Sequence, residues 1–205
     1  AEVAALMNES GARFLLTGEG TADCSLAAAD RSHVRQVFAF GDVPGTTSFG
    51  RLLEPGAGSG VPLSLDPLRD TALRVCTSSE DVTHADRLAD LYRLGGVLGL
   101  GKGDVLALSG VDVPALTWVG LVDLCITQGA SVVGVAAAGS RELLETILEK
   151  GVTVAVVTPA TLRAIAFDHG QVPVPGVRLL VSGDPSAEAV RACRARHGWG
   201  VSLLC

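Results

Sequence analysis

Residues 140–167, SRELLETILEKGVTVAVVTPATLRAIAF, carry the pattern that decides the fold. An amphipathic segment of helical length, 141–150, is followed by the continuous apolar run 152–157 and by a second amphipathic segment, 160–167. A short and wholly apolar run between two helices is typical of a strand that is buried on both faces of a parallel sheet. The stretch therefore predicts an α/β protein in which helices cover a parallel sheet.

The ends of the expected helices carry their own signals. Ser140 is expected to cap the first helix, and Gly151 is expected to end it in a left-handed conformation, just after Lys150. Two further strands are expected to end at a cap residue followed by proline in the first helical position, at Thr158-Pro159 and at Asp184-Pro185.

The same alternation extends along the whole chain. We expect strands at 13–17, 34–40, 72–77, 105–108, 131–135, 152–157, 177–181 and 201–204. We expect helices at 2–8, 21–29, 82–98, 113–127, 141–150, 160–167 and 187–197. The predicted fold class is α/β, a largely parallel sheet flanked by helices.

The glycine-rich stretch EPGAGSGVP at 54–62 divides this pattern. We predict an N-terminal α/β segment at 1–53, a flexible joint at 54–66 and a main α/β segment at 67–205, which together form one continuous domain. With 205 residues and 48% hydrophobic content, the chain is large enough to bury a core.

Charge and cysteine content exclude several classes of function. The formal net charge is −6 and no basic face is evident, which argues against nucleic acid and anionic membranes as partners. No apolar run is long enough to span a bilayer, and no secretion signal is evident, so we expect a cytoplasmic protein. The five cysteines and four histidines are scattered, so we expect no metal site and no disulfide framework.

Residues 75–86, VCTSSEDVTHAD, raise the question of a phosphate site. The pattern predicts a strand that runs into a Ser/Thr-rich turn and then into a helix, which is where a phosphate binds in many α/β proteins. However, Ser78 and Asp81 have capping-box spacing, so we expect an ordinary capped helix start without phosphate. Glu80 and Asp81 would also repel an anion docked there.

In open α/β sheets, ligands collect at the carboxyl ends of the strands. The turns that follow the expected strands, 76–79, 109–114, 158–160 and 182–185, are therefore the candidate rim of a site. A nucleophile is not indicated in any of them, because Ser109 lacks the preceding glycine that a nucleophile elbow requires. We predict no catalytic residue and no metal ligand.

Four stretches make the chain resemble the large N-terminal domain of the adenylate-forming superfamily, which includes acyl-CoA synthetases. They are AEVAALMNESGARFLLTGEG (1–20), DPLRDTALRVCTSS (66–79), DVPALTWVGLVDLCITQGASVVGV (112–135) and VRLLVSGDPSAEAVRACRARHG (177–198). The segment 142–165 resembles the family's helix–strand–proline segment. The resemblance implies nucleotide-binding positions at Thr77, Ser78, Ser79 and Gly183, and an acyl-pocket rim at Asp112, Val113, Thr158 and Pro159.

The chain departs from this family where the chemistry would lie. The family's phosphate loop reads roughly T-S-G-T-T-G-x-P-K-G, whereas here Ser79 replaces the first glycine and the other glycines and the lysine are absent. Asp112 stands where the family usually has an aromatic residue or histidine, and only Gly183 remains of the glycine-rich adenine turn. The family's magnesium-associated glutamate and its C-terminal lysine are expected beyond Cys205.

These departures leave three hypotheses. The first is a degenerate adenylate-forming domain with an impaired ATP site, whose role is to bind an acyl group, a nucleotide fragment or a partner protein. The alternative is an active ATP-dependent carboxylate-activating acyl-CoA or acyl-carrier ligase, or a fragment of one, which would use ATP with magnesium and coenzyme A. The third is a structural module that self-associates through exposed sheet edges. The sequence does not identify an acyl substrate.

Overall fold

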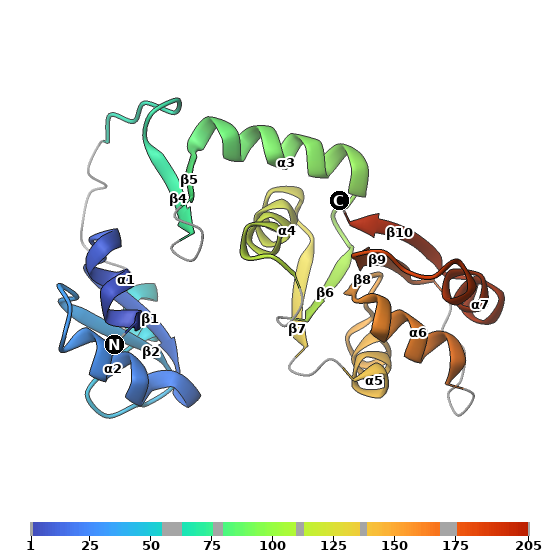
Figure 1. Cartoon of the computed structure of the whole chain (residues 1–205), viewed down its shortest axis with the longest axis horizontal. Helices are drawn as coiled ribbons and strands as arrows, with labels where there is room; N and C mark the ends of the chain where they lie inside the picture. Colours follow the sequence, from blue (N-terminus) through green and yellow to red (C-terminus); the bar gives the residue numbers. More distant parts are fainter. Residues whose placement is uncertain are drawn as a thin grey trace. The chain divides into compact units, whose positions relative to one another are not determined.

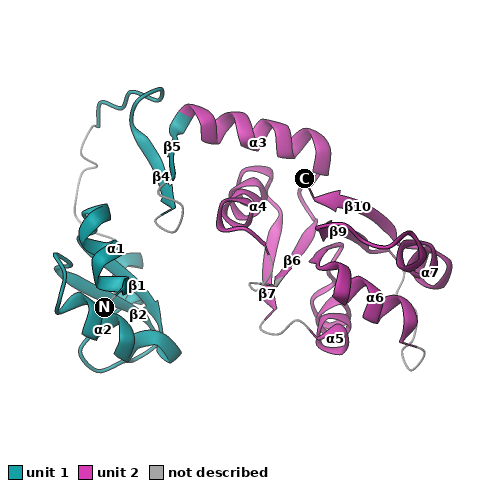
Figure 2. Ribbon diagram, viewed as in Figure 1, with its two compact units in different colours: residues 1–84 teal, residues 85–205 magenta. Residues whose placement is uncertain are grey.

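The computed structural model of the chain describes residues 2–54, 63–75, 80–109, 113–135, 139–168 and 176–204. The chain divides into two compact units, residues 1–84 and 85–205 (Figure 2). This boundary lies beyond the joint predicted at 54–66, most of which is outside the described residues. The division into segments at that joint stays a prediction.

The first unit begins with a small parallel sheet covered by helices on one face. Its elements are α1 (Glu2–Ser10), β1 (Phe14–Gly18), the 3-10 helix η1 (Glu19–Thr21), α2 (Ala22–Ala29), β2 (Gln36–Phe40), β3 (Thr47–Ser48) and the 3-10 helix η2 (Phe49–Leu53). The strands lie in the order β1-β2-β3 and all pair in parallel. Ala4, Met7 and Ala28 form its buried core, against Leu15 and Val34.

The first unit ends with an antiparallel hairpin of β4 (Thr71–Val75) and β5 (Glu80–Thr83). This corrects the prediction that a capped helix begins at Ser78 and includes residue 82, because Asp81 lies in a strand and α3 begins only at His84. Pairing across the hairpin explains the difference. It buries Val82 and sets Asp81 opposite Arg74, and these contacts outweigh the local capping pattern.

The second unit is built on a five-stranded parallel sheet in the order β10-β9-β8-β6-β7 (Figure 1). Its elements are α3 (His84–Leu98), β6 (Val105–Ser109), α4 (Ala115–Gln128), β7 (Ser131–Val135), α5 (Ser140–Lys150), β8 (Val154–Val157), α6 (Pro159–Phe167), β9 (Arg178–Ser182), α7 (Ala187–His197) and β10 (Gly200–Leu204). The predicted α/β class with a largely parallel sheet is confirmed.

Successive residues of the central strands face two different cores. On one face, Ala155 and Val157 of β8 pack with α5, α6 and α7, which Figure 1 shows gathered on one side of the sheet. On the other face, Val154 and Val156 pack with α3 and α4. Because both faces are covered, β8 is buried along its whole length, as the apolar run 152–157 predicted.

Two of the predicted helix ends are confirmed and two are wrong. Gly151 ends α5 with a φ of 63°, and Thr158 caps α6 by accepting a hydrogen bond from the Thr161 backbone N–H at 3.1 Å. However, Ser140 is already helical, so Gly139 takes the cap position. At the start of α7, Ser186 is the cap instead of Asp184, because its Oγ accepts from the Ala189 N–H at 3.2 Å.

Candidate functional site

The connections between strands of the second unit change direction at one position in the sheet, between β6 and β8. After β6 the chain passes through α4 to β7, whereas after β8 it passes through α6 to β9, on the other side of β6. The helices α4 and α6 belong to the cores on opposite faces of the sheet. The connections after these two neighbouring strands therefore diverge, which is the topological switch point where open α/β sheets bind ligands.

The predicted rim residues lie around this switch point, as far as the described chain shows them. Thr158 and Pro159 follow β8, and Gly183 follows β9, the next strand in the sheet. A Cβ atom placed on Gly183 would lie 3.4 Å from Cγ of Pro159, so these two turns are in contact. Gly183 has a φ of +109°, a conformation that glycine adopts without strain.

The third part of the rim follows β6. Val113 begins the turn into α4 and packs, half-buried, against the core between α3, α4 and the sheet. Asp112 lies outside the described residues, so its predicted place on the rim stays a prediction. The structure thus brings Thr158, Pro159 and Gly183 together and places Val113 after the neighbouring strand.

The chemistry of these rim residues is neutral. Thr158, Pro159, Val113 and Gly183 carry no charge, and none of them titrates near neutral pH. The Thr158 hydroxyl already takes part in hydrogen bonds within α6, because it accepts from the Thr161 N–H and lies 3.0 Å from the Thr161 hydroxyl. These residues can line a ligand and contact it through backbone groups, but they supply no acid, base or nucleophile.

The predicted phosphate-binding residues Thr77, Ser78 and Ser79 lie between β4 and β5, outside the described residues. The strand before them, β4, pairs antiparallel with β5 and is not part of the five-stranded parallel sheet. Their role in binding a nucleotide stays a prediction.

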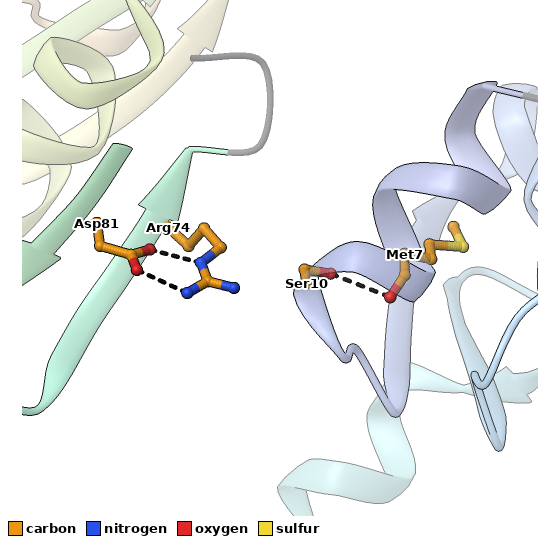
Figure 3. Close-up of polar contacts among 4 residues, drawn as sticks. All are labelled: Met7, Ser10, Arg74 and Asp81. Atoms are coloured by element: carbon orange, nitrogen blue, oxygen red, sulfur yellow. Dashed lines mark hydrogen bonds and ion pairs between the residues drawn. The ribbon is translucent and has the colours of Figure 1, made fainter. Parts of the chain in front are cut away.

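An ion pair joins β4 to β5 (Figure 3). Arg74 Nε donates to Oδ1 of Asp81 at 2.5 Å, and Arg74 Nη2 donates to Oδ2 at 2.6 Å. The two residues are direct cross-strand neighbours, and each side chain is 43% exposed. The hydrogen bond from Arg74 lowers the pKa of Asp81, so the carboxylate is charged at neutral pH.

Sequence reasoning did not identify this pair. Arg74 and Asp81 are seven residues apart, and they become neighbours only if both flanking segments are strands. Because residues from 82 onward were predicted to be helical, the pairing of Arg74 with Asp81 across two strands was not considered. The available signal was the short Ser/Thr-rich turn between an alternating strand and EDVT at 80–83, which also fits a hairpin.

Another ion pair, in the second unit, has a structural role. Arg87 of α3 is buried, and its Nη2 and Nε donate to Oδ2 of Asp123 on α4 at 2.8 and 3.1 Å. The pair joins two helices of one core and leaves the guanidinium with an acceptor. Within the described ranges, no group of three or more His, Cys, Asp or Glu side chains could hold a metal ion.

Comparison with known proteins finds similarity in fold only. No protein-family profile matches the chain, and no curated protein matches it in sequence. Solved structures of similar fold include a long-chain-fatty-acid-CoA ligase from Archaeoglobus fulgidus, with a TM-score of 0.75, 18% identity and coverage of 96% of this chain and 42% of that chain. A benzoate CoA ligase from Burkholderia xenovorans LB400 has a TM-score of 0.76 and 15% identity, with coverage of 99% and 43%.

A third similar structure is the N-terminal domain of FACL13 from Mycobacterium tuberculosis, with a TM-score of 0.75, 16% identity and coverage of 98% of this chain and 52% of that chain. The chain thus has the fold of the N-terminal domain of adenylate-forming enzymes, as the sequence resemblance predicted. It spans about half of the length of these three structures. No helix in the described part of the chain is both long and apolar enough to cross a membrane.

Proposed function

We propose that this chain is a degenerate adenylate-forming domain with an impaired ATP site, whose role is to bind a ligand or a partner. The observation that carries the proposal is the pairing of Arg74 with Asp81, on the two strands that flank Thr77, Ser78 and Ser79 in the sequence. Phosphate binding requires cationic side chains or backbone N–H groups that are turned toward the anion. Here the arginine of the hairpin already binds a carboxylate, and Glu80 adds a second negative charge.

The described rim turns at the switch point contain no cationic side chain and one acidic residue, Asp184, and this supports an acyl ligand over a nucleotide. Val113 and Pro159 offer apolar surface, whereas a nucleotide bound there would bring phosphate charge to residues that cannot neutralise it. An acyl group has no charge along its chain and needs only apolar contacts. The proposed ligands are accordingly an acyl group first, then an uncharged nucleotide fragment, and a partner protein that covers the same rim.

The test of this proposal is a calorimetric titration of the purified chain with ATP and magnesium chloride. We expect no heat of binding at ATP concentrations up to about 1 mM, which corresponds to a binding free energy weaker than about −4.1 kcal/mol. Magnesium chloride without ATP is the matched control. Saturable binding of ATP in the micromolar range would contradict the impaired site and favour the ligase alternative.

The ligase alternative keeps the same fold and differs in chemistry. In it, Thr77, Ser78 and Ser79 would contact the phosphates, Gly183 would lie near the adenine, and the chain would use ATP, magnesium and coenzyme A. The fold shared with a fatty-acid-CoA ligase and a benzoate CoA ligase supports this alternative. The lack of a cationic side chain in the described rim turns and the Arg74–Asp81 pair support the degenerate domain instead.

A third proposal, self-association, has support from the edges of the five-stranded sheet. Among the described strands, β7 and β10 lie at the two edges, and neither contains a charged residue or a proline to discourage pairing with another strand. We expect sedimentation at micromolar concentration to show a dimer or larger species. A single species at the monomer mass would contradict self-association.

The cytoplasmic location also stays a prediction.

A further inference from the structure

His197, the last residue of α7, is a buried histidine whose ring nitrogens have no hydrogen-bond partner. Its exposed fraction is 6%, and neither Nδ1 nor Nε2 is hydrogen-bonded to any group in the described part of the chain. Most buried polar side chains in folded proteins are hydrogen-bonded. An imidazole without a partner in an apolar core is tolerated in its neutral form, because burial penalises the charged form far more strongly.

This histidine lies where α6, α7 and β10 meet. Its ring centroid is 4.5 Å from that of Trp199, and the two ring planes are inclined by 31°. Trp199 is buried in the core that α6 and α7 share, and it leads directly into β10. The backbone carbonyl of Ile165, on α6, lies near the histidine ring. The contact therefore joins the two helices that begin at the rim turns of the candidate site.

The immediate surroundings of His197 favour the neutral ring. Burial lowers the pKa of His197 below its ordinary value of 6.5, and the charge of Arg196 lowers it further, while the Ile165 carbonyl opposes these two effects more weakly. Cys193, four residues earlier on α7, is also buried. Burial raises the pKa of the Cys193 thiol to about 11, so the thiol is uncharged at neutral pH.

The other charged groups of these elements do not act as counter-ions for His197. The described strand β10 has no titratable side chain, and the charge of Arg178, on β9, acts on Asp104. Arg163 of α6 is exposed and lies over the ring of Phe167. The causes that shift the pKa of His197 include neither Asp168, at the end of α6, nor Glu188, in the first turn of α7.

We propose that His197 is an acid-sensitive contact, which holds α7 and β10 against α6 while its ring is neutral and loosens them when the ring is protonated. A protonated ring in this core would be a buried cation next to Arg196 and without a hydrogen-bond acceptor of normal geometry among the described residues. Such a charge is removed from a core either by losing the proton or by local opening that admits water.

The direction of the pH dependence follows from the two protonation equilibria. In the unfolded chain, His197 takes up a proton near its ordinary pKa of 6.5, whereas the folded chain takes it up only at lower pH. The stabilisation is therefore present in full above pH 6.5, and it is lost as the pH falls through the pKa of the folded state. One proton bound only by the unfolded chain changes the unfolding equilibrium constant up to about tenfold per pH unit, or about 1.4 kcal/mol.

The experiment measures urea unfolding of the full chain at several pH values between about 7.5 and 5.5, where histidine is the side chain that titrates. A Trp118→Phe background leaves Trp199 as the single tryptophan, so that its fluorescence reports on this region. His197→Phe keeps a ring beside Trp199 without titration, and His197→Gln removes the titration but stays polar. His33→Gln is the matched control, because His33 is exposed. An NMR titration of the His197 ring gives its folded-state pKa without unfolding.

We expect the unfolding constant of the background chain and of the His33→Gln control to rise below pH 6.5, by up to about tenfold per pH unit. Both His197 variants should show a shallower dependence, and the ring should titrate below 6.5. An unchanged pH dependence in the His197 variants would overturn the inference. A ring that titrates at or above 6.5 would do the same, and this titration decides the question alone if neither variant folds.

Discussion

Replacing Trp199 with alanine is expected to lower the free energy of unfolding by about 3–5 kcal/mol, the usual cost of removing a large aromatic side chain from a core. Trp199 is only 1% exposed and is among the largest fully buried side chains. It lies in the core that α5, α6 and α7 form with the sheet, and its ring centroid is 4.5 Å from that of His197. Alanine would leave a cavity at the point where α7 leads into β10.

The chain supplies a matched control for this substitution in its other tryptophan, Trp118. Trp118 lies in the first turn of α4 and is 38% exposed, so alanine there removes less buried surface. Urea denaturation followed by far-UV circular dichroism compares the two variants without relying on tryptophan fluorescence. Equal losses of stability at the two positions would show that burial of Trp199 does not hold the α7–β10 region together.

The parts of the fold that the sequence predicted well are those in which local and tertiary forces agree. The strand at Ser131–Val135 and the helix at Ala187–His197 match the structure residue for residue. Strands of a parallel sheet are buried on both faces, so they stand out as short apolar runs between amphipathic helices. Gly151 and Thr158 add end signals that depend only on the backbone and side chain of the residue itself.

The failures lie where a distant contact changes a local preference. EDVT at 80–83 has no strong strand pattern, and it becomes a strand because β4 lies beside it. The two-residue strand β3 is too short to give a periodic signal, and it is identified only by its pairing with β2. The cap of α7 was predicted two residues too early, at Asp184. Ser186 is also a residue type that caps helices, and in the structure it is Ser186 that takes the cap position.

The candidate site also has parts that were predicted from the sequence and parts that were not. The rule that ligands bind at the carboxyl ends of parallel strands selected the turns at 158–160 and 182–185, and the contact between Gly183 and Pro159 shows that these two turns are adjacent. The roles of Thr158, Pro159 and Gly183 were implied by the family resemblance and stay predictions. The Arg74–Asp81 pair could not be predicted, because it depends on the register of a hairpin that the sequence did not reveal. A contact that depends on how two strands pair is thus harder to predict from the sequence than a turn that follows a parallel strand.

The second large effect concerns turnover. Attack of a carboxylate on the α-phosphate of ATP needs positioned donors and cations that stabilise the developing charge. Removing one such donor from an enzyme typically slows the reaction by about 10²–10³-fold. In this chain, Arg74 binds Asp81, and the described rim turns carry no cation, since their one charged residue, Asp184, is acidic. The sequence at 77–79 also lacks the glycines and the lysine of the family's phosphate loop, so we expect no measurable activation of any carboxylate.

Carboxylate-dependent exchange of pyrophosphate into ATP measures this step most directly, because it requires only the formation and reversal of the acyl-adenylate. Benzoate and a long-chain fatty acid are suitable carboxylates, since ligases named for both have this fold. We expect the purified chain to give a rate equal to that of a control without protein, with either carboxylate. A rate above that control that appears only when a carboxylate is added would contradict the degenerate-domain proposal and establish an active ligase.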